Sequence, residues 1–137
     1  MKIKKNYAHL IGCLCTSIRK SSRNISRVYN EILKQSGEKI TANQLSILVL
    51  LSEIKTASIT DLSDQLKTER TTMTRNLNVL EKSKWIKIYG GNDGRMKYIK
   101  INTKGIKIIK KIVPHWKKAE NVSKKLIGED IEIFRKT

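Results

Sequence analysis

The chain has 137 residues, of which 39% are hydrophobic and 30% charged, and this length suffices for one soluble domain without disulfides or metals. Lys and Arg outnumber Asp and Glu by 29 to 12, so the formal net charge of +17 predicts a polyanionic partner. Two histidines far apart in the chain, no glycine-rich phosphate loop and scattered carboxylates argue against an enzyme.

The cysteine content and the hydropathy indicate the compartment. Cys13 and Cys15 stand one residue apart, and a single pair of this kind cannot build a disulfide framework, which points to a reducing environment. No stretch approaches the roughly 18 apolar residues of a membrane span. We therefore expect a soluble cytoplasmic protein.

The first third of the chain predicts two helices. Apolar residues recur at helical spacing from about Tyr7 to Gln35, which is typical of one long amphipathic helix that ends at Ser36-Gly37. The stretch Thr41-Ala42-Asn43-Gln44 fits a capping box, in which the hydroxyl and the amide satisfy each other's backbone donors. The helix that it opens is almost entirely apolar, so we expect it to be buried on all sides.

Two further helices follow. A short one is predicted from Ile59 to Leu66 with Thr60 as its cap, and another begins after Lys67-Thr68 and runs to about Lys82. The second of these has an apolar inner stripe of Met73, Leu77 and Leu80. At about 100° per residue its opposite side carries polar side chains, namely Thr71, Arg75, Asn78 and Lys82.

The period then changes from helix to strand. Ile86 and Ile88 alternate with polar or aromatic residues, as do Ile99 and Ile101, and the turn-forming residues 90–95 lie between them, so a β-hairpin with a basic tip is predicted. A fifth helix is expected to start with Thr103 as its cap, to kink or break at Pro114 and to be interrupted near Gly128. With no linker and no repeat, residues 1–137 are interpreted as a single domain.

This order of elements is typical of a winged helix-turn-helix: mainly α, with a small β-hairpin wing. The helix with the polar face fits a major groove, and Arg95 at the hairpin tip fits the narrower minor groove. The candidate DNA contacts are Thr71, Thr72, Thr74, Arg75 and Asn78 on the helix and Lys87, Arg95, Lys97 and Lys100 on the hairpin. The alternative is that the polar face of this helix contacts only water. The basic hairpin that accompanies this face favours DNA contact instead.

At these residues the chain resembles the MarR family of transcriptional regulators over nearly its whole length. The resemblance is carried by Thr41-x-x-Gln44, Leu62 with Leu66, Thr71 to Leu77 with Leu80-Glu81, Asp93-Gly94-Arg95 and Asn102 to Gly105. It implies a homodimer built by residues 1–36 and 103–137, and a DNA-binding winged helix at 41–101 that reads a pseudo-palindromic operator, with repression as the expected mode of action. It also implies that Asp93 and Gly94 support the wing arginine.

Two positions depart from the family pattern. The final helix of most relatives is longer than the one that ends at Thr137, which predicts a dimer interface that is smaller or relies more on the first helix. Trp85 follows Lys84 where relatives usually have a glycine at the entrance to the wing, which predicts a different local turn.

The first helix is similar to the organic-hydroperoxide-sensing branch of the family, through Cys15, Ser21-Ser22-Arg23 and Tyr29. In that branch the matching cysteine is oxidised, and tyrosines hydrogen-bond to its sulfur across the dimer. Fourteen residues separate Cys15 from Tyr29, or roughly 21 Å along a helix, so only two antiparallel helices could bring them together. Arg19 replaces a second tyrosine of that branch, and an arginine there would lower the thiol pKa.

Other interpretations of the first helix stay open. The cysteines could be small buried residues, or they could bind a metal with His9 or His115, although this spacing does not supply four ligands. A small carboxylate effector received by His9, Arg19 and Arg23 is a further alternative. No cofactor and no resident metal are expected. For the whole protein, the rival to a sequence-specific regulator is a sequence-tolerant architectural protein that coats DNA, which the net charge favours.

Overall fold

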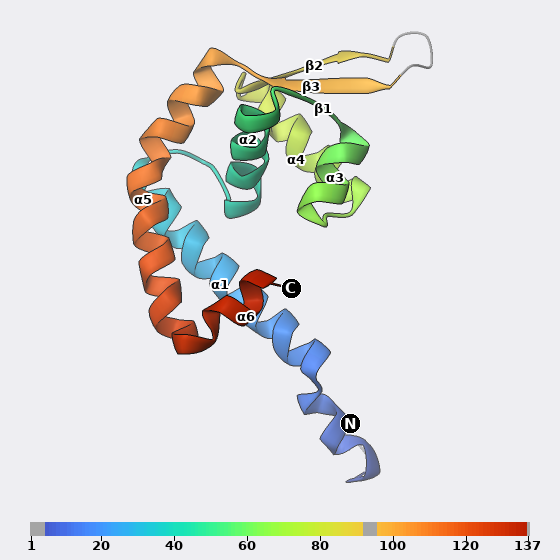
Figure 1. Cartoon of the computed structure of the whole chain (residues 1–137), viewed down its shortest axis with the longest axis vertical. Coiled ribbons are helices and arrows are strands. Elements are labelled where there is room, and N and C mark those ends of the chain that lie inside the picture. Colours follow the sequence, from blue (N-terminus) through green and yellow to red (C-terminus); the bar gives the residue numbers. More distant parts are fainter. Residues whose placement is uncertain (1–4, 92–95, 137) are drawn as a thin grey trace.

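The computed structural model describes residues 5–91 and 96–136, which form a mainly helical fold with a three-stranded antiparallel sheet (Figure 1). The expected fold class, mainly α with a small β wing, is confirmed. The elements in chain order are the 3-10 helix η1 (Lys5–Gly12), α1 (Leu14–Leu33), the 3-10 helix η2 (Lys34–Ser36), α2 (Ala42–Ile54), β1 (Thr56–Ser58), α3 (Ile59–Leu66), α4 (Arg70–Lys82), β2 (Ile86–Gly90), β3 (Lys97–Ile101), α5 (Thr103–Ile127), the 3-10 helix η3 (Gly128–Asp130) and α6 (Ile131–Lys136).

The expected first helix is divided in two. The 3-10 helix η1 ends at Gly12, and Cys13 precedes α1 in an extended conformation with φ −61° and ψ 155°. Gly12 is a poor helix former because glycine loses much backbone entropy in a helix, which favours the break at this point. The predicted C-terminal stop is confirmed: Gly37 follows η2 with a left-handed φ of 83°.

Capping boxes start both α2 and α3. The Thr41 box is confirmed, since the Thr41 hydroxyl accepts from the Gln44 amide and the Gln44 side chain accepts from the Thr41 amide. For α3 the predicted cap was wrong: Ser58, not Thr60, forms the box with Asp61. The unexpected strand β1 explains this, because it keeps residues 56–58 extended and places the N-cap at its last residue.

The three strands have the order β1-β3-β2. The core lies where α2, α3 and α4 cover one face of this sheet and α5 packs against α2, and its fully buried side chains include Leu48, Leu51, Leu62, Met73, Leu77, Leu80, Ile86, Ile99 and Ile112. The expectation that α2 is buried on all sides was wrong for Val49 and Ile54, which are 42% and 36% exposed. Val49 lines a cavity of about 630 Å³ between α2 and α5, so this side of α2 is not fully covered.

The helix α5 runs from Thr103 to Ile127 without a break at Pro114, so the predicted break was wrong, and a kink at Pro114 stays a prediction. Pro114 and Lys110, whose carbonyl loses its usual hydrogen bond, both lie on the exposed side of the helix, where the cost of proline inside a helix is reduced. The predicted interruption at Gly128 is confirmed. Asn102 precedes α5 as its N-cap residue without a side-chain bond, so Thr103 is not the cap.

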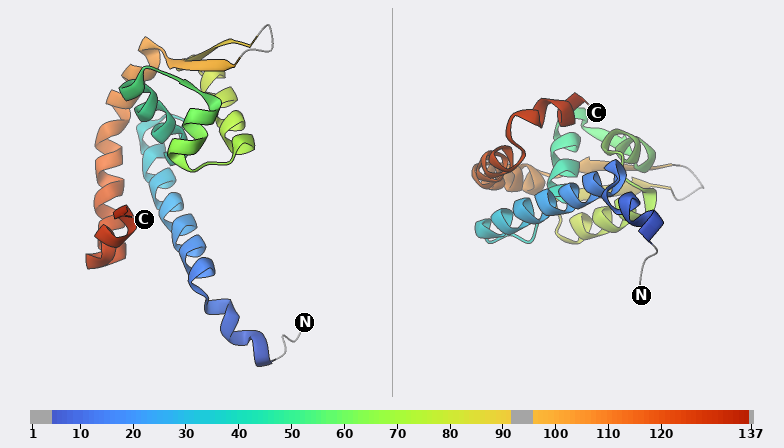
Figure 2. Two further views of the ribbon diagram at one scale, coloured as in Figure 1. Left: turned by 45° about the vertical axis from the view of Figure 1, so that its right-hand side comes forward. Right: turned by 90° about the horizontal axis from the view of Figure 1, so that it is seen from below.

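α1 and α5 lie side by side, and α6 folds back toward α1 (Figures 1 and 2). The Tyr29 hydroxyl on α1 donates to the Glu120 carboxylate on α5, and Arg135 on α6 donates to the same carboxylate at 3.1 Å. The first turns of α1 extend away from the rest of the molecule (Figure 2). No helix among the described residues has the length and apolar character needed to span a bilayer.

Candidate nucleic-acid interface

The two faces of α4 differ sharply in burial. Met73, Leu77 and Leu80 are at most 1% exposed, which confirms the inner stripe. The predicted outer residues Thr71, Arg75, Asn78 and Lys82 are exposed, as is Thr74, whereas Thr72 is half-buried at the edge of the helix. The helix is therefore fixed by its apolar side and presents hydroxyl, amide and guanidinium groups to a partner.

The turn after α4 orients this helix against the wing. Lys84 adopts a left-handed φ of 61°, the conformation that a glycine would take at lower cost, and the Trp85 amide donates to the Leu80 carbonyl at 3.1 Å. The Glu81 carboxylate accepts from the Ile88 amide at 2.9 Å. The lysine at the glycine position thus keeps a glycine-type turn, and a side chain of α4 is bonded directly to β2.

The register between β2 and β3 determines which lysine of the hairpin lies on the same face of the sheet as α4. Gly90 pairs with Lys97, and Ile88 with Ile99, so Lys97 is on the same face of the sheet as the buried Ile99. On this face a groove of about 510 Å³ is formed by the start of α3, the start of α4 and the start of β3. Its lining residues are Ser58, Ile59, Thr60, Arg70, Thr74, Met96 and Lys97.

The structure thus brings together two predicted residues, Thr74 and Lys97, with two that sequence reasoning missed, Arg70 and Thr60. Arg70 is the first residue of α4 and lies one turn before Thr74, so helical periodicity could have identified it. The sequence pattern predicts Thr60 as a helix cap, so its exposed position within α3 was not expected.

The other face of the hairpin carries a second basic group. Lys87 and Lys100 are direct cross-strand partners, and both are exposed. Like charges opposite each other in a sheet repel, so this pair lowers stability unless an anion lies between them. Lys87 and Lys97 therefore belong to opposite faces of the wing.

Asp93, Gly94 and Arg95 lie outside the described residues, so their predicted roles stay predictions.

The predicted sensor residues lie on α1. Cys15 and Arg19 are exposed, and so is Cys13, so neither cysteine packs in the core of this chain. The Cys13 sulfur and the Thr16 hydroxyl are 3.2 Å apart, and this hydrogen bond lowers the pKa of the Cys13 thiol. Burial, together with the hydrogen bond to Glu120, raises the pKa of Tyr29.

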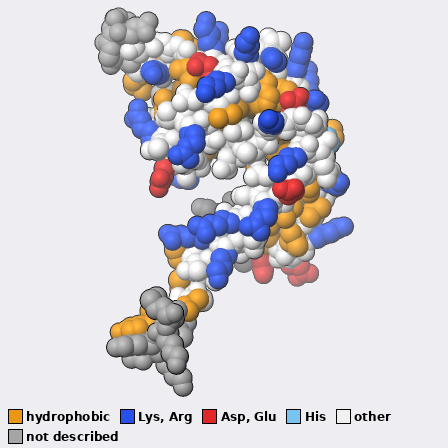
Figure 3. Space-filling view, turned by 180° about the vertical axis from the view of Figure 1, so that it is seen from behind, with side chains coloured by type: hydrophobic (Ala, Val, Ile, Leu, Met, Phe, Trp, Pro, Cys, Tyr) orange, Lys and Arg blue, Asp and Glu red, His pale blue; other side chains and the backbone are white. Residues whose placement is uncertain are grey.

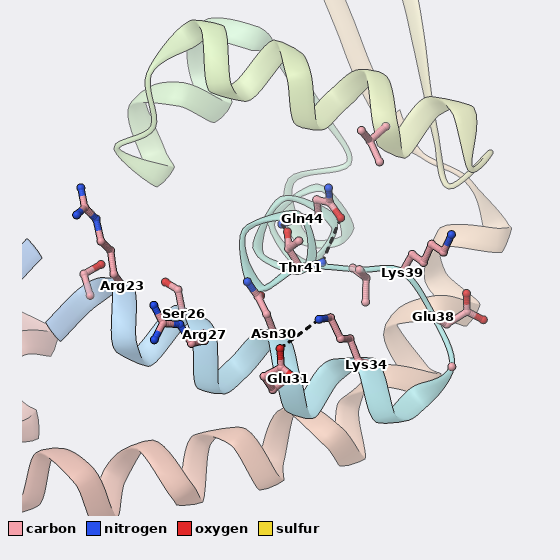
Figure 4. Close-up of a pocket in the computed structure, with 14 residues that line it drawn as sticks. Arg23, Ser26, Arg27, Asn30, Glu31, Lys34, Glu38, Lys39, Thr41 and Gln44 are labelled. Carbon is pink, nitrogen blue, oxygen red and sulfur yellow. Dashed lines mark hydrogen bonds and ion pairs between the residues drawn. The ribbon is translucent and has the colours of Figure 1, made fainter. Parts of the chain in front are cut away.

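A basic groove separates α1 from the winged helix (Figure 4). It has a volume of about 920 Å³ and is lined by Val79 of α4 and by six charged residues, four of them basic: Arg23, Arg27, Glu31, Lys34, Glu38 and Lys39. Lys34 is paired with Glu31 at 3.1 Å. Arg23 belongs to the predicted carboxylate site. Arg19 does not line the groove, and the side chain of His9 lies outside the described residues. Within residues 5–91 and 96–136, no three His, Cys, Asp or Glu side chains gather as a metal site would require.

The segment that supplies α2, α3, α4 and the first strand of the hairpin also has a sequence match. Residues 40–95 match the MarR family. This part of the chain is similar to the MarR family. It contains the outer face of α4 and, except for Met96 and Lys97, the residues that line the groove of about 510 Å³. No curated protein sequence matches the chain.

Solved structures with the MarR-family fold resemble the chain over most of its length. The transcriptional regulator MosR of M. tuberculosis, solved in complex with DNA, is 29% identical, with 90% of each chain covered and a TM-score of 0.77. A mutant of MarR from E. coli, complexed with operator DNA, is 22% identical, with 95% of each chain covered and a TM-score of 0.77. BpsR of Bordetella bronchiseptica, whose DNA binding is regulated by 6-hydroxynicotinic acid, is 14% identical, with 92% and 93% covered and a TM-score of 0.79. The last two likenesses concern the fold alone.

Proposed function

We propose that this protein is a MarR-family transcriptional regulator, acting as a repressor, that binds duplex DNA sequence-specifically as a homodimer with one α4 in the major groove of each half-site. The single observation that carries the proposal is the exposed polar face of α4, held by a buried apolar face beside a basic hairpin. The MosR structure that resembles this chain holds DNA, which supports a duplex as the ligand.

The residue types suggest how the duplex is read. Arginine can bond both acceptors of a guanine edge, and asparagine both groups of an adenine edge, so Arg75 and Asn78 are the candidates for base contacts. Arg70 and Lys97 lie on the groove beside α3 and suit phosphate contacts that set the register of α4. The exposed pair of Lys87 and Lys100 would be relieved by a phosphate.

Homodimerisation is supported by apolar side chains that no described residue of this chain covers. Along η1 and the first turns of α1, Leu10, Ile11, Leu14 and Ile18 are 46–76% exposed. Near the C-terminal end, Leu126 and Phe134 are 63% and 51% exposed. Apolar side chains gathered in this way mark a protein interface, and a second copy of the chain would bury them.

The test is the affinity for the DNA upstream of the protein's own gene, compared with scrambled duplex at near-physiological salt. A sequence-specific regulator should prefer the upstream DNA by about a thousandfold or more. Arg75→Ala should cost about 1–3 kcal/mol and relax the sequence preference, since it removes a base contact. Lys87→Ala is the matched control, with an expected loss that is the same for all sequences. A specificity ratio near one for the wild type would refute the proposal.

The signal that this regulator answers stays a prediction. The exposed Cys15 favours a thiol response, and the basic groove beside Arg23 favours an anionic effector. The thiol response and the anionic effector are distinguished by repeating the affinity measurement after mild peroxide treatment, with Cys15→Ser as the control. Loss of affinity in the wild type but not in the variant would support oxidation of Cys15, and equal behaviour would leave the groove as the candidate.

A further inference from the structure

The outer face of α5 carries many positive charges. Eight lysines lie along it, and all eight are exposed: Lys104, Lys107, Lys110, Lys111, Lys117, Lys118, Lys124 and Lys125. At about 100° per residue they fall in two neighbouring rows that occupy less than half of the helix circumference. The remaining exposed residues between these rows are Thr103, Pro114 and Asn121, which carry no charge.

Little neutralises these charges. Glu120 is the one acidic residue of α5, and it is half-buried and bonded to Tyr29 and Arg135. Among the eight lysines, ion pairs to described residues are made by Lys111, to Glu38 at 2.8 Å, and by Lys124, to Glu120 at 3.8 Å. A helix that serves only solubility normally intersperses both signs, because pairs of opposite charge stabilise it.

Two other partners fit this surface poorly. In a two-fold dimer the same patch meets itself or a neighbouring patch of the same chain, so a lysine face against its own copy would be repelled. A membrane-surface helix needs large apolar side chains beside its cations. Within the lysine rows the exposed large apolar side chain is Val122, at 37%, and Leu126 lies just outside them. The exposed Val113 and Trp116 lie on the α2 side, where they line the cavity beside Val49. One valine gives such a helix little apolar surface to insert into a bilayer.

The dimensions and the position suit duplex DNA. A helix of 25 residues is about 37 Å long, close to one helical turn of the duplex. α5 leaves the sheet at the end opposite the hairpin tip and runs away from α4 (Figure 1), and basic side chains follow its course in the space-filling view (Figure 3). A straight duplex lying along α4 and the hairpin would not follow α5.

We propose that the outer face of α5 binds the phosphate backbone of a second duplex segment, distinct from the segment that α4 contacts. Lysine suits this role because its ammonium group acts as a point charge on phosphates and reads no sequence. Contact of this kind lets one protein hold two parts of a DNA molecule together. It does not require that α4 recognise a specific sequence.

The decisive experiment is lysine acetylation of the full-length protein, with each site quantified by mass spectrometry. The protein is treated alone, with one equivalent of a short duplex per dimer, and with a large excess of random-sequence duplex. Lys107, Lys110, Lys117 and Lys125 should be protected several-fold only in excess duplex, after Lys97 is already protected. Equal modification of these four with and without excess duplex would overturn the proposal. Protection by vesicles of anionic lipid but not by duplex would also overturn it.

A variant with matched charge gives a second readout. Replacing Lys107, Lys110, Lys117 and Lys125 by Gln should lower the slope of log affinity against log salt for random duplex, by about 0.9 for each lost phosphate contact. The control replaces four exposed lysines elsewhere by Gln, namely Lys20, Lys39, Lys55 and Lys136, and should leave the slope nearly unchanged. Equal slopes for both variants would contradict the proposal. Because random duplex is used, this result does not depend on whether an operator exists.

Discussion

Gly105 has no room for a side chain. A Cβ at this position would lie 2.3 Å from the Trp85 carbonyl oxygen and 2.7 Å from Cγ1 of Ile101, and the Asn102 amide donates to the same carbonyl at 2.9 Å. The start of α5 thus lies directly against the turn between α4 and β2. This contact fixes the winged helix relative to the long helix and explains the glycine in the stretch from Asn102 to Gly105.

Gly105→Ala should therefore destabilise the protein by about 1–3 kcal/mol, because backbone must move to admit the methyl group. Alanine would otherwise favour a helix by about 1 kcal/mol over glycine, so a loss of stability has to come from the clash. Urea unfolding followed by circular dichroism measures the effect. The matched control is Gly12→Ala, where a Cβ would have nothing within 4 Å. A Gly105 variant as stable as the Gly12 variant would contradict this explanation.

The thiol of Cys13 offers a second test on single residues. Its hydrogen bond with the Thr16 hydroxyl lowers the thiol pKa, so more of it is thiolate at neutral pH. Thr16→Val should slow the alkylation of Cys13 by iodoacetamide, which reacts with the thiolate, and raise the midpoint of its rate against pH. The rate at Cys15, measured in the same peptide map, is the internal reference. An unchanged Cys13 rate would show that Thr16 has no influence on the thiol.

Sequence patterns predicted single residues well where one local signal decides their role. The Thr41 box and the Gly37 stop follow from spacing within a few residues. The cap of α3 could not be predicted from such spacing, because Ser58 also ends the strand β1, whose partner β3 lies forty residues later in the chain. The position of Lys97 beside Thr74 likewise depends on the register of the hairpin, which alternation alone leaves undetermined.

At the scale of elements, the strongly amphipathic helices were predictable and the irregular ones were not. The bounds of α3 and the stripe of α4 follow from the 3.6-residue period. β1 has three residues, too few to show alternation, and the proline inside α5 would end most helices. α5 tolerates it because the helix is held on its inner side by buried residues on both sides of Pro114, Ile112 and Ala119.

The contact between α1 and α5 gives a prediction at this scale. Burial, with the Glu120 carboxylate as hydrogen-bond acceptor, raises the pKa of Tyr29, so the folded protein holds the phenol proton more tightly than the unfolded chain does. The corresponding stability is fully present below the ordinary tyrosine pKa of about 10 and is lost as the pH rises above it. Tyr29→Phe removes this contribution.

The measurement is urea unfolding of wild type and variant at several pH values between 7 and 11. Tyr29→Phe should be less stable than wild type at pH 7, and the difference should shrink as the pH rises above about 10. Tyr98→Phe, which removes a hydroxyl from the exposed face of the hairpin, serves as the control and should show no such convergence. A difference that stays constant with pH would mean that Tyr29 contributes packing alone.

At the scale of the whole molecule, the two ends of the chain expose apolar side chains that a single protomer does not bury. Leu14 is 76% exposed at the start of α1, beyond the reach of α5, and Ile18 follows one turn later. Sequence periodicity identified this stripe but could not show that this chain leaves its first turns uncovered. A DNA-reading dimer needs the stripe because two half-sites are bound strongly only if the two winged helices are joined.

Leu14→Asp should convert the proposed dimer to a monomer, since it places a charge in the middle of the proposed apolar interface. The protomer itself should stay folded, because Leu14 makes no contact with the core and an acidic residue in the first turn of a helix interacts favourably with its dipole. Sedimentation should show the change in mass, and affinity for a palindromic duplex should fall by about a hundredfold or more, while affinity for a single half-site changes little. Ser17→Asp introduces the same charge at a polar exposed position of α1 and should remain dimeric. If Leu14→Asp instead stays dimeric with full palindrome affinity, the protomers are joined elsewhere, and the exposed apolar residues of α1 have a different partner.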